Sequence, residues 1–267
     1  MSDSEIVLIT GANTGIGYQV VRALYSADKP YTVLVGARSL QKSQDAIAAI
    51  QAEFSSSANK LSTLVVDIES DESIQAAYEA VKEQFGRLDV LINNAGAQFD
   101  PHILSGTLTP REAWNKSWDL NVTSTHLFTH ALTPLLLASP TPRLLFVTSG
   151  TSTLAGTYNP AFFLNHHPEP GWPKPSGGFS VATYRSAKTG LNMVLREWDR
   201  LLKKDGVKVF AISPGFLATG LGGDTELLKK MGAGDPVVAG ALFRDVIEGR
   251  RDGDVGRVVN KDGVQEW

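Results

Sequence analysis

The fold of this chain is decided by residues 6–17, IVLITGANTGIG, close to the start of the sequence. Four apolar residues, Ile6 to Ile9, predict a buried strand, and a helical pattern begins at Ile16. The glycines between them let the chain turn sharply and let a ligand approach the backbone. Free N–H groups at the start of a helix favour a pyrophosphate, and a strand-to-helix turn without any ligand is the alternative. We therefore predict a dinucleotide-phosphate site made of Gly11, Asn13, Thr14, Gly15, Ile16 and Gly17.

Downstream of this run, short apolar stretches alternate with amphipathic ones. The apolar stretches are residues 31–35, 61–66, 90–92, 144–147 and 207–212. The helical patterns cover residues 16–24, 39–54, 71–85, 182–204 and 111–137, the last interrupted by Pro134. Short, near-continuously apolar strands are typical of a parallel sheet covered on both faces. The alternation predicts an α/β fold: one Rossmann-like, doubly wound parallel sheet of about seven strands with helices on both faces. No linker or repeat divides the chain, so we expect one domain over residues 1–267.

Two segments depart from the alternation. Residues 153–180 are rich in proline, glycine and aromatic residues, and a loop this long inside a domain is usually functional. Its aromatic residues either form an apolar wall for a substrate or anchor the loop on the sheet. Residues 217–234 carry Gly-Gly and Gly-Ala-Gly around a short helical pattern, which predicts a lid over the substrate.

The composition excludes several kinds of site. The formal net charge of -3 gives no reason to expect nucleic acid or an anionic membrane as a partner. No run of about 18 apolar residues predicts a membrane span, and the first residues lack the pattern of a signal peptide, so we expect a cytoplasmic location. The absence of cysteine excludes thiolate catalysis and Cys-ligated zinc. The adjacent His166 and His167 lack the spacing of a helical metal site, so no metal is predicted.

The glycine spacing in residues 11–17 is G-x-x-x-G-x-G, which differs from the usual G-x-G-x-x-G of dinucleotide-binding folds. This form resembles the short-chain dehydrogenase/reductase family. The resemblance runs from Ile6 to about Val259, because further motifs follow in the order of that family. They are Asp67 after the third predicted strand, Asn93-Asn94-Ala95-Gly96 after the fourth, Ser149 after the fifth, Tyr184-x-x-x-Lys188 in a helix, and Ser213-Pro214-Gly215 after the sixth.

The end of the second predicted strand favours NADP(H) over NAD(H). Ala37 stands where family members that use NAD carry an acidic residue for the ribose 2′-OH, so no carboxylate repels a 2′-phosphate. The guanidinium of Arg38 can bind that phosphate through two hydrogen bonds, although a solvated arginine at a helix start is the alternative. The resemblance implies further cofactor contacts from Asp67, Ile68, Asn94, Ala95, Gly96, Tyr184, Lys188, Pro214, Gly215 and Thr219.

Tyr184 and Lys188 are four residues apart in a helical pattern, so both side chains can point into one cleft. A nearby ammonium lowers the pKa of a phenol. A phenol whose pKa is lowered in this way can give a proton to a developing alkoxide. The resemblance implies that Ser149 hydrogen-bonds the substrate carbonyl and that Asn121 holds a water that joins the lysine to solvent. Ser152 is a rival to Ser149, less well placed relative to the strand.

These residues together predict an NADPH-dependent, carbonyl-reductase-like oxidoreductase that reduces a ketone, aldehyde or quinone to an alcohol. We expect an apolar or aromatic small-molecule substrate; the direction of reaction follows from the resemblance alone. Non-redox chemistry on the same fold, such as epimerisation or dehydration, and a non-enzymatic NADP(H)-sensing regulatory protein are the alternatives. Relative to a typical family member, about 20 extra residues separate Ser149 from Tyr184. Monomeric carbonyl reductases of the family carry an insertion here too, so both a monomer and a homo-oligomer stay open.

Overall fold

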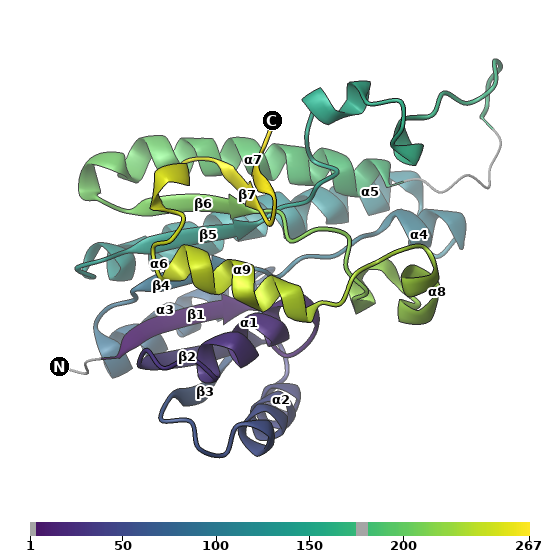
Figure 1. Cartoon of the computed structure of the whole chain (residues 1–267). Helices are drawn as coiled ribbons and strands as arrows, with labels where there is room; N and C mark the ends of the chain where they lie inside the picture. Colours follow the sequence, from purple (N-terminus) through teal and green to yellow (C-terminus); the bar gives the residue numbers. More distant parts are fainter. Residues whose placement is uncertain (1–3, 175–180) are drawn as a thin grey trace.

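A parallel sheet forms the centre of the molecule (Figure 1). The computed structural model describes residues 4–174 and 181–267. The eight strands lie in the order β3-β2-β1-β4-β5-β6-β7-β8, all neighbours being parallel except β7 and β8. They are β1 (Glu5–Thr10), β2 (Tyr31–Ala37), β3 (Lys60–Val65), β4 (Val90–Asn93), β5 (Arg143–Val147), β6 (Lys208–Ile212), β7 (Val258–Asn260) and β8 (Gly263–Gln265). The predicted Rossmann-like class is confirmed. The count exceeds the expected seven because β8 adds a short antiparallel edge strand.

The near-continuous apolar character of the strands follows from two separate cores. Along β1, the side chain of Leu8 belongs to one apolar cluster, and its neighbours Val7 and Ile9 belong to the other. The first face is covered by helices α3 (Asp71–Phe85), α6 (Thr125–Leu137) and α7 (Ala182–Leu202). The second is covered by α1 (Gly15–Tyr25), α2 (Leu40–Glu53) and α9 (Val237–Ile247). Because successive side chains of a strand point to opposite faces, most positions of a central strand that is covered on both faces are apolar.

The predicted helices are present within a few residues of their expected ends. They are α1 (Gly15–Tyr25), α2 (Leu40–Glu53), α3 (Asp71–Phe85), α5 (Pro110–Trp118), α6 (Thr125–Leu137) and α7 (Ala182–Leu202). Helices α4 (Asp100–Leu104), α8 (Thr225–Lys230) and α9 (Val237–Ile247) complete the set in the described part of the chain. Serine hydroxyls cap the N-termini of two of the predicted helices. Ser39 accepts a hydrogen bond from the Lys42 N–H, and Ser70 accepts one from the Ser73 N–H.

The expectation that Pro134 interrupts the long helical pattern is wrong. Pro134 lies inside α6, where packing of Phe128 and Leu132 in the core outweighs the loss of one backbone hydrogen bond. The interruption lies earlier, at a π-helical turn, η1 (Asp119–Ser124), between α5 and α6. This turn contains Asn121, a candidate site residue.

The two irregular segments lie at the end of the molecule to which the parallel strands point (Figure 1). The insertion, residues 153–180, is described as far as residue 174 and contains the short turns η2 (Ala155–Tyr158) and η3 (Phe163–Asn165). Its residues 175–180 lie outside the described part of the chain. The predicted lid, residues 217–234, contains η5 (Gly220–Gly222) and α8, and a backbone bridge between Leu217 and Gly234 closes it.

None of the described helices is both long and apolar enough to cross a membrane.

Candidate active site

A cleft of about 1270 Å³ opens at the carboxyl ends of the parallel strands, between the insertion and the lid. This is where a doubly wound sheet is expected to bind its ligands. Most of the predicted site residues line it. They are Gly11, Asn13, Thr14, Gly15, Ile16, Arg38, Asp67, Ile68, Asn94, Ala95, Gly96, Ser149, Tyr184, Lys188, Pro214, Gly215 and Thr219.

The phosphate loop joins β1 to α1 and rests on β4. Gly11 and Gly15 have positive φ angles of 61° and 57°, which only glycine adopts without strain. The amide of Asn94 donates to the carbonyl oxygens of Thr10 (2.8 Å) and Gly11 (3.0 Å) and so holds the loop from behind. Gly17 does not line the cleft. A Cβ there would lie 2.6 Å from both Gly11 O and Asn94 Nδ2, so Gly17 serves the close packing of loop, helix and β4.

Beside the phosphate loop, Ala37 is buried at the end of β2, and the next residue, Arg38, is exposed. Among the described residues, none forms an ion pair with Arg38. Its guanidinium can therefore meet a phosphate without first leaving another partner. Asp67 follows β3, and its carboxylate accepts a hydrogen bond from the Glu69 N–H at 3.1 Å.

Tyr184 and Lys188 lie on the first turns of α7 and face the cleft. The ammonium of Lys188 lies 5.7 Å from the centre of the Tyr184 ring and donates to Val147 O at 2.8 Å. Burial lowers the pKa of Lys188 to about 8. Burial also raises the pKa of Tyr184 to about 12, against the opposing effect of the Ser149 hydroxyl. The expected lowering of the tyrosine pKa by the lysine is thus not found in the protein by itself. The phenol stays protonated at neutral pH, as a proton donor must.

Ser149 and its rival Ser152 are clearly separated by the structure. Both lie in the serine loop, residues 148–152, which follows β5. Ser149 is partly exposed and lines the cleft, and its Oγ accepts from the Thr151 N–H at 3.1 Å. Ser152 is fully buried, and its hydroxyl donates to Ser149 O at 2.6 Å. Only the Ser149 hydroxyl is placed to reach a ligand in the cleft.

Asn121 lies behind the cleft rather than in its lining. Its side chain is fully buried in the π turn, and its Nδ2 donates to Ala97 O and Ser117 O, both at 2.9 Å. Its Oδ1 is buried and has no hydrogen-bond partner among the described residues. A Cβ on Gly96 would lie 2.7 Å from this oxygen and 3.3 Å from Lys188 Nζ, so amide and ammonium flank the same glycine. Asn121 therefore offers a free acceptor close to the lysine.

Comparison with known proteins identifies the family. A family model described as short chain dehydrogenase matches residues 5–162. The chain belongs to the short-chain dehydrogenase family. It is therefore an oxidoreductase of a family whose members act on small molecules.

Two fungal short-chain dehydrogenases are similar over almost their whole length. The short-chain dehydrogenase/reductase eupG of Phoma sp is 46% identical, covering 98% of this chain and 97% of that protein. The short-chain dehydrogenase/reductase tropE of Talaromyces stipitatus is 40% identical over the same shares, 98% and 97%. Among solved structures, the NADPH-bound carbonyl reductase from chicken fatty liver is 22% identical, covers 100% of both chains and superimposes with a TM-score of 0.78.

In this short-chain dehydrogenase the start of α7, which carries Tyr184 and Lys188, is capped by a residue that the sequence patterns did not single out. The carboxylate of Asp100, in α4, is buried and accepts from Thr183 N (2.9 Å), Thr183 Oγ1 (2.7 Å) and Tyr184 N (3.2 Å). Val181, the residue that precedes the helix, has no side chain that can do this. The only local signal is the Asp-Pro pair at 100–101, which marks a helix start but not a partner.

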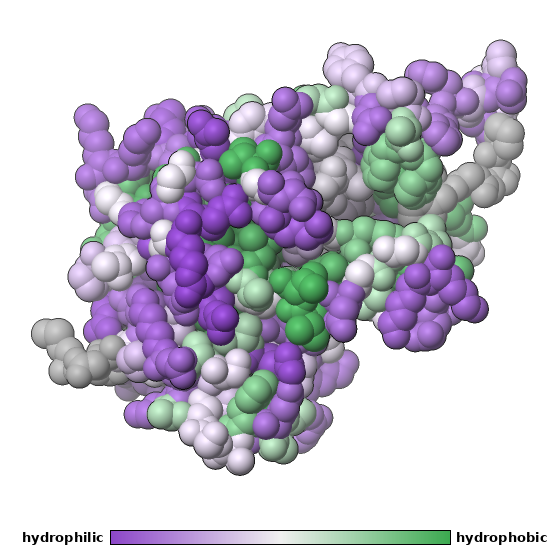
Figure 2. Space-filling view, viewed as in Figure 1, coloured by the Kyte–Doolittle hydropathy of each residue, from purple (hydrophilic) through white to green (hydrophobic). Residues whose placement is uncertain are grey.

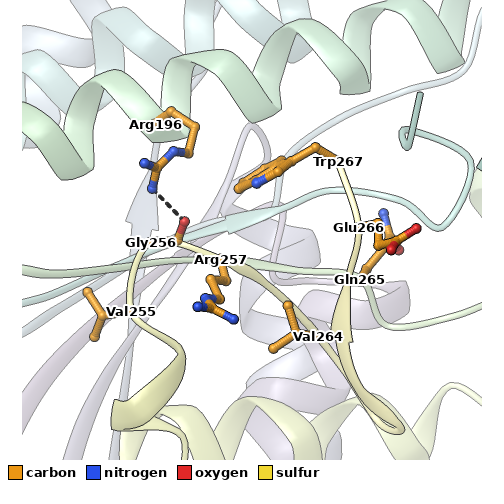
Figure 3. Close-up of a pocket in the computed structure, with 8 residues that line it drawn as sticks. All are labelled: Arg196, Val255, Gly256, Arg257, Val264, Gln265, Glu266 and Trp267. Carbon is orange, nitrogen blue, oxygen red and sulfur yellow. Dashed lines mark hydrogen bonds between the residues drawn. The ribbon is translucent and has the colours of Figure 1, made fainter. Parts of the chain in front are cut away.

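A second residue without a sequence signal braces the serine loop of this dehydrogenase. Gln265 in β8 donates from Nε2 to Ser149 O at 3.2 Å. Residues 264–267, which include Gln265, also border a separate cavity of about 370 Å³ (Figure 3). There the Trp267 ring lies 5.8 Å from the Arg196 guanidinium, and Arg196 donates to Gly256 O at 2.8 Å. None of the predicted site residues lines this cavity.

Proposed function

We propose that this short-chain dehydrogenase reduces a carbonyl compound to an alcohol with NADPH, and that Tyr184 donates the proton. The observation that carries the proposal is the meeting of Ser149, Tyr184 and Lys188 in one cleft with the phosphate loop. The structural similarity to the carbonyl reductase from chicken fatty liver supports the same reaction.

The cleft residues fit NADPH. The start of α1 lacks any side-chain cap from Thr14, which leaves its N–H groups for a pyrophosphate, and Gly11 and Gly15 keep the loop free of side chains there. The exposed Arg38 suits a 2′-phosphate, and the NADPH-bound neighbour is in keeping with this choice. When bound, NADPH supplies the hydride that is transferred to the carbonyl carbon.

The chain's own groups act on the carbonyl oxygen. The Ser149 hydroxyl donates a hydrogen bond that orients the carbonyl and stabilises the negative charge as it develops. As the C=O π bond breaks, the Tyr184 hydroxyl gives its proton to that oxygen, and the alcohol forms. The Lys188 ammonium stabilises the phenolate left on Tyr184. Asn121 Oδ1, close to Lys188, can accept a hydrogen bond from a water that returns the proton from solvent.

Replacement of the tyrosine tests this proposal. Tyr184→Phe should lower kcat for NADPH-dependent carbonyl reduction by about 10²–10⁴-fold, because no other group replaces the proton donor. NADPH affinity, measured by fluorescence titration, should change by less than about threefold. Tyr158→Phe is the matched control, because Tyr158 is 88% exposed and does not line the cleft. Full activity of Tyr184→Phe would refute the assigned role.

The same assay separates the alternatives. A sensor would bind NADPH and oxidise none of it with any ketone, aldehyde or quinone. An epimerase or dehydratase would convert its substrate without net oxidation of NADPH. Net NADPH oxidation in step with alcohol formation excludes both.

A further inference from the structure

The insertion is not held in place by a hydrophobic core. No residue from 153 to 174 is buried, and neither η2 nor η3 buries a side chain. In Figures 1 and 2 this segment projects beyond the body of the molecule. Yet Phe162, Phe163 and Leu164 line the cleft. Polar contacts must therefore decide where this part of the pocket wall lies, since apolar burial, the usual source of such order, is missing.

One side chain supplies most of these contacts. Arg185 follows Tyr184 on α7 and is half-buried. Its Nη2 donates to Asn165 Oδ1 at 3.1 Å and its Nη1 to Leu164 O at 3.4 Å. Its Nε donates to Thr151 O at 3.1 Å, in the serine loop. The guanidinium is a rigid fork of donors, so it can hold the catalytic helix, the serine loop and the insertion in one arrangement.

Asn165 passes this anchoring on through the insertion. Its Nδ2 donates to Gly156 O and Asn159 O, both at 2.8 Å, and so joins η2 to η3. These bonds turn its Oδ1 towards Arg185. At the root of the insertion, the Ala155 N–H donates to Trp267 O at 2.8 Å, beside the cavity of Figure 3. The described insertion is thus a small polar unit fixed at two places, and the place nearer the reacting groups is Arg185.

We infer that Arg185 and Asn165 form a pin that fixes Phe162, Phe163 and Leu164 as one wall of the substrate pocket, which makes Arg185 a specificity-determining residue. This inference rests on the proposed carbonyl reduction. A bulky aromatic ketone reaches the wall and depends on the pin, whereas a small dicarbonyl fits beside the catalytic residues without touching it. Arg185 also borders the cleft, but its guanidinium donates to Thr151 O, Leu164 O and Asn165 Oδ1, so it acts through the wall and is a positioning residue.

Selectivity between two substrates tests the inference. In Arg185→Ala and Asn165→Ala, kcat/KM for 2-acetylnaphthalene should fall about 10–100-fold, mainly through KM. The value for 2,3-butanedione should change less than about threefold. The double variant should be no worse than Arg185→Ala, because Arg185→Ala by itself already removes the pin. Arg200→Ala removes an exposed arginine of the same helix that pairs with Glu197, and it should leave kcat/KM for both substrates unchanged. Arg185→Lys keeps the charge but loses the planar set of N–H donors, so its kcat/KM for 2-acetylnaphthalene should lie between those of the wild type and Arg185→Ala.

A measurement that needs no turnover keeps the pin separate from the reaction. Backbone hydrogen exchange in peptides from residues 153–174 should become faster in Arg185→Ala and Asn165→Ala, but not in Arg200→Ala. Unchanged exchange in the first two variants would refute the pin. Faster exchange with an equal loss for both ketones would refute the selectivity, because Arg185 would then support the chemistry itself. Absence of any carbonyl reduction by the unaltered enzyme would refute the proposed function and the selectivity, while the exchange result still decides the pin.

Discussion

Lys188 shows how a single residue can serve function at the expense of stability. Its ammonium is almost fully buried, and Val147 O is its one hydrogen-bond acceptor among the residues that the structure describes. Burial of a cation with so few partners is unfavourable, which is why its pKa falls from 10.5 to about 8. The same position brings the charge next to Tyr184, where a phenolate would form. We regard the unfavourable burial as the condition for that stabilisation.

Replacement of Lys188 by methionine should separate the effect of the buried charge on stability from its effect on the reaction. Below pH 8 the lysine is protonated in both states, so the folded state bears the full penalty. Between pH 8 and 10.5 the unfolded state binds more protons, so stability rises with pH, and above 10.5 the penalty is gone. Lys188→Met should therefore raise the free energy of unfolding by about 1–3 kcal/mol at pH 7, and much less above pH 10.5, while carbonyl reduction is lost. Urea unfolding at both pH values measures this, and a less stable variant at pH 7 would contradict it.

At the scale of the element, the catalytic helix depends on a cap from another part of the chain. Asp100 accepts three hydrogen bonds from Thr183 and Tyr184 and places a carboxylate at the N-terminus of α7. A negative charge there also interacts favourably with the helix dipole. Because Tyr184 lies in the first turn, disorder at this end of α7 would directly move the proposed proton donor.

Asp100→Ala should lower the free energy of unfolding by about 1–3 kcal/mol and lower kcat, with little change in NADPH affinity. Asp100→Asn should lose less stability and less kcat, since its amide oxygen can still accept a hydrogen bond from the start of α7. The matched control is Thr109→Ala, which removes the capping box of α5, a helix without catalytic residues. That variant should lose a similar stability but keep its kcat. Thermal unfolding and steady-state kinetics decide, and equal kcat in Asp100→Ala and the wild type would rule out the positioning role.

At the scale of the whole molecule, the cleft draws its lining from loops that follow many strands of the sheet. Gly11, Asp67, Asn94, Ser149 and Pro214 belong to different connections along the chain and meet only at this edge. A ligand that contacts all of them binds the folded state alone. It therefore stabilises the entire domain rather than one segment.

NADPH should raise the melting temperature in a single unfolding transition, with a gain of about 2.7 kcal/mol when its concentration is 100 times its Kd. NADH at the same concentration should give a smaller gain, since it lacks the 2′-phosphate that Arg38 would bind. In Arg38→Ala the ratio of NADPH affinity to NADH affinity should fall by about tenfold. Differential scanning fluorimetry with both cofactors measures it. A larger shift with NADH in the unaltered protein would overturn the NADP(H) assignment.

The sequence by itself determined what depends on neighbouring residues. Periodicity predicted strands β1 to β6 and most of the helices, but not α4, α9 or the short strands β7 and β8. The glycines of residues 11–17 predicted the turn into α1, and the spacing of Tyr184 and Lys188 placed both on one helix face. These signals are local, because side-chain alternation and helical repeat are properties of short stretches of backbone. The order of the motifs then sufficed to predict the family and the cleft.

Only the tertiary structure decided what depends on contacts between distant segments. Asp100 caps a helix 83 residues away, and Gln265 braces a serine 116 residues away, separations at which no periodicity operates. The sequence predicted that Lys188 lowers the pKa of Tyr184, whereas burial, which the sequence does not give, raises this pKa in the protein alone. The insertion likewise lacks an apolar pattern, so its place beside the cleft follows from the hydrogen bonds of Arg185, which exist only once α7 and the insertion have met.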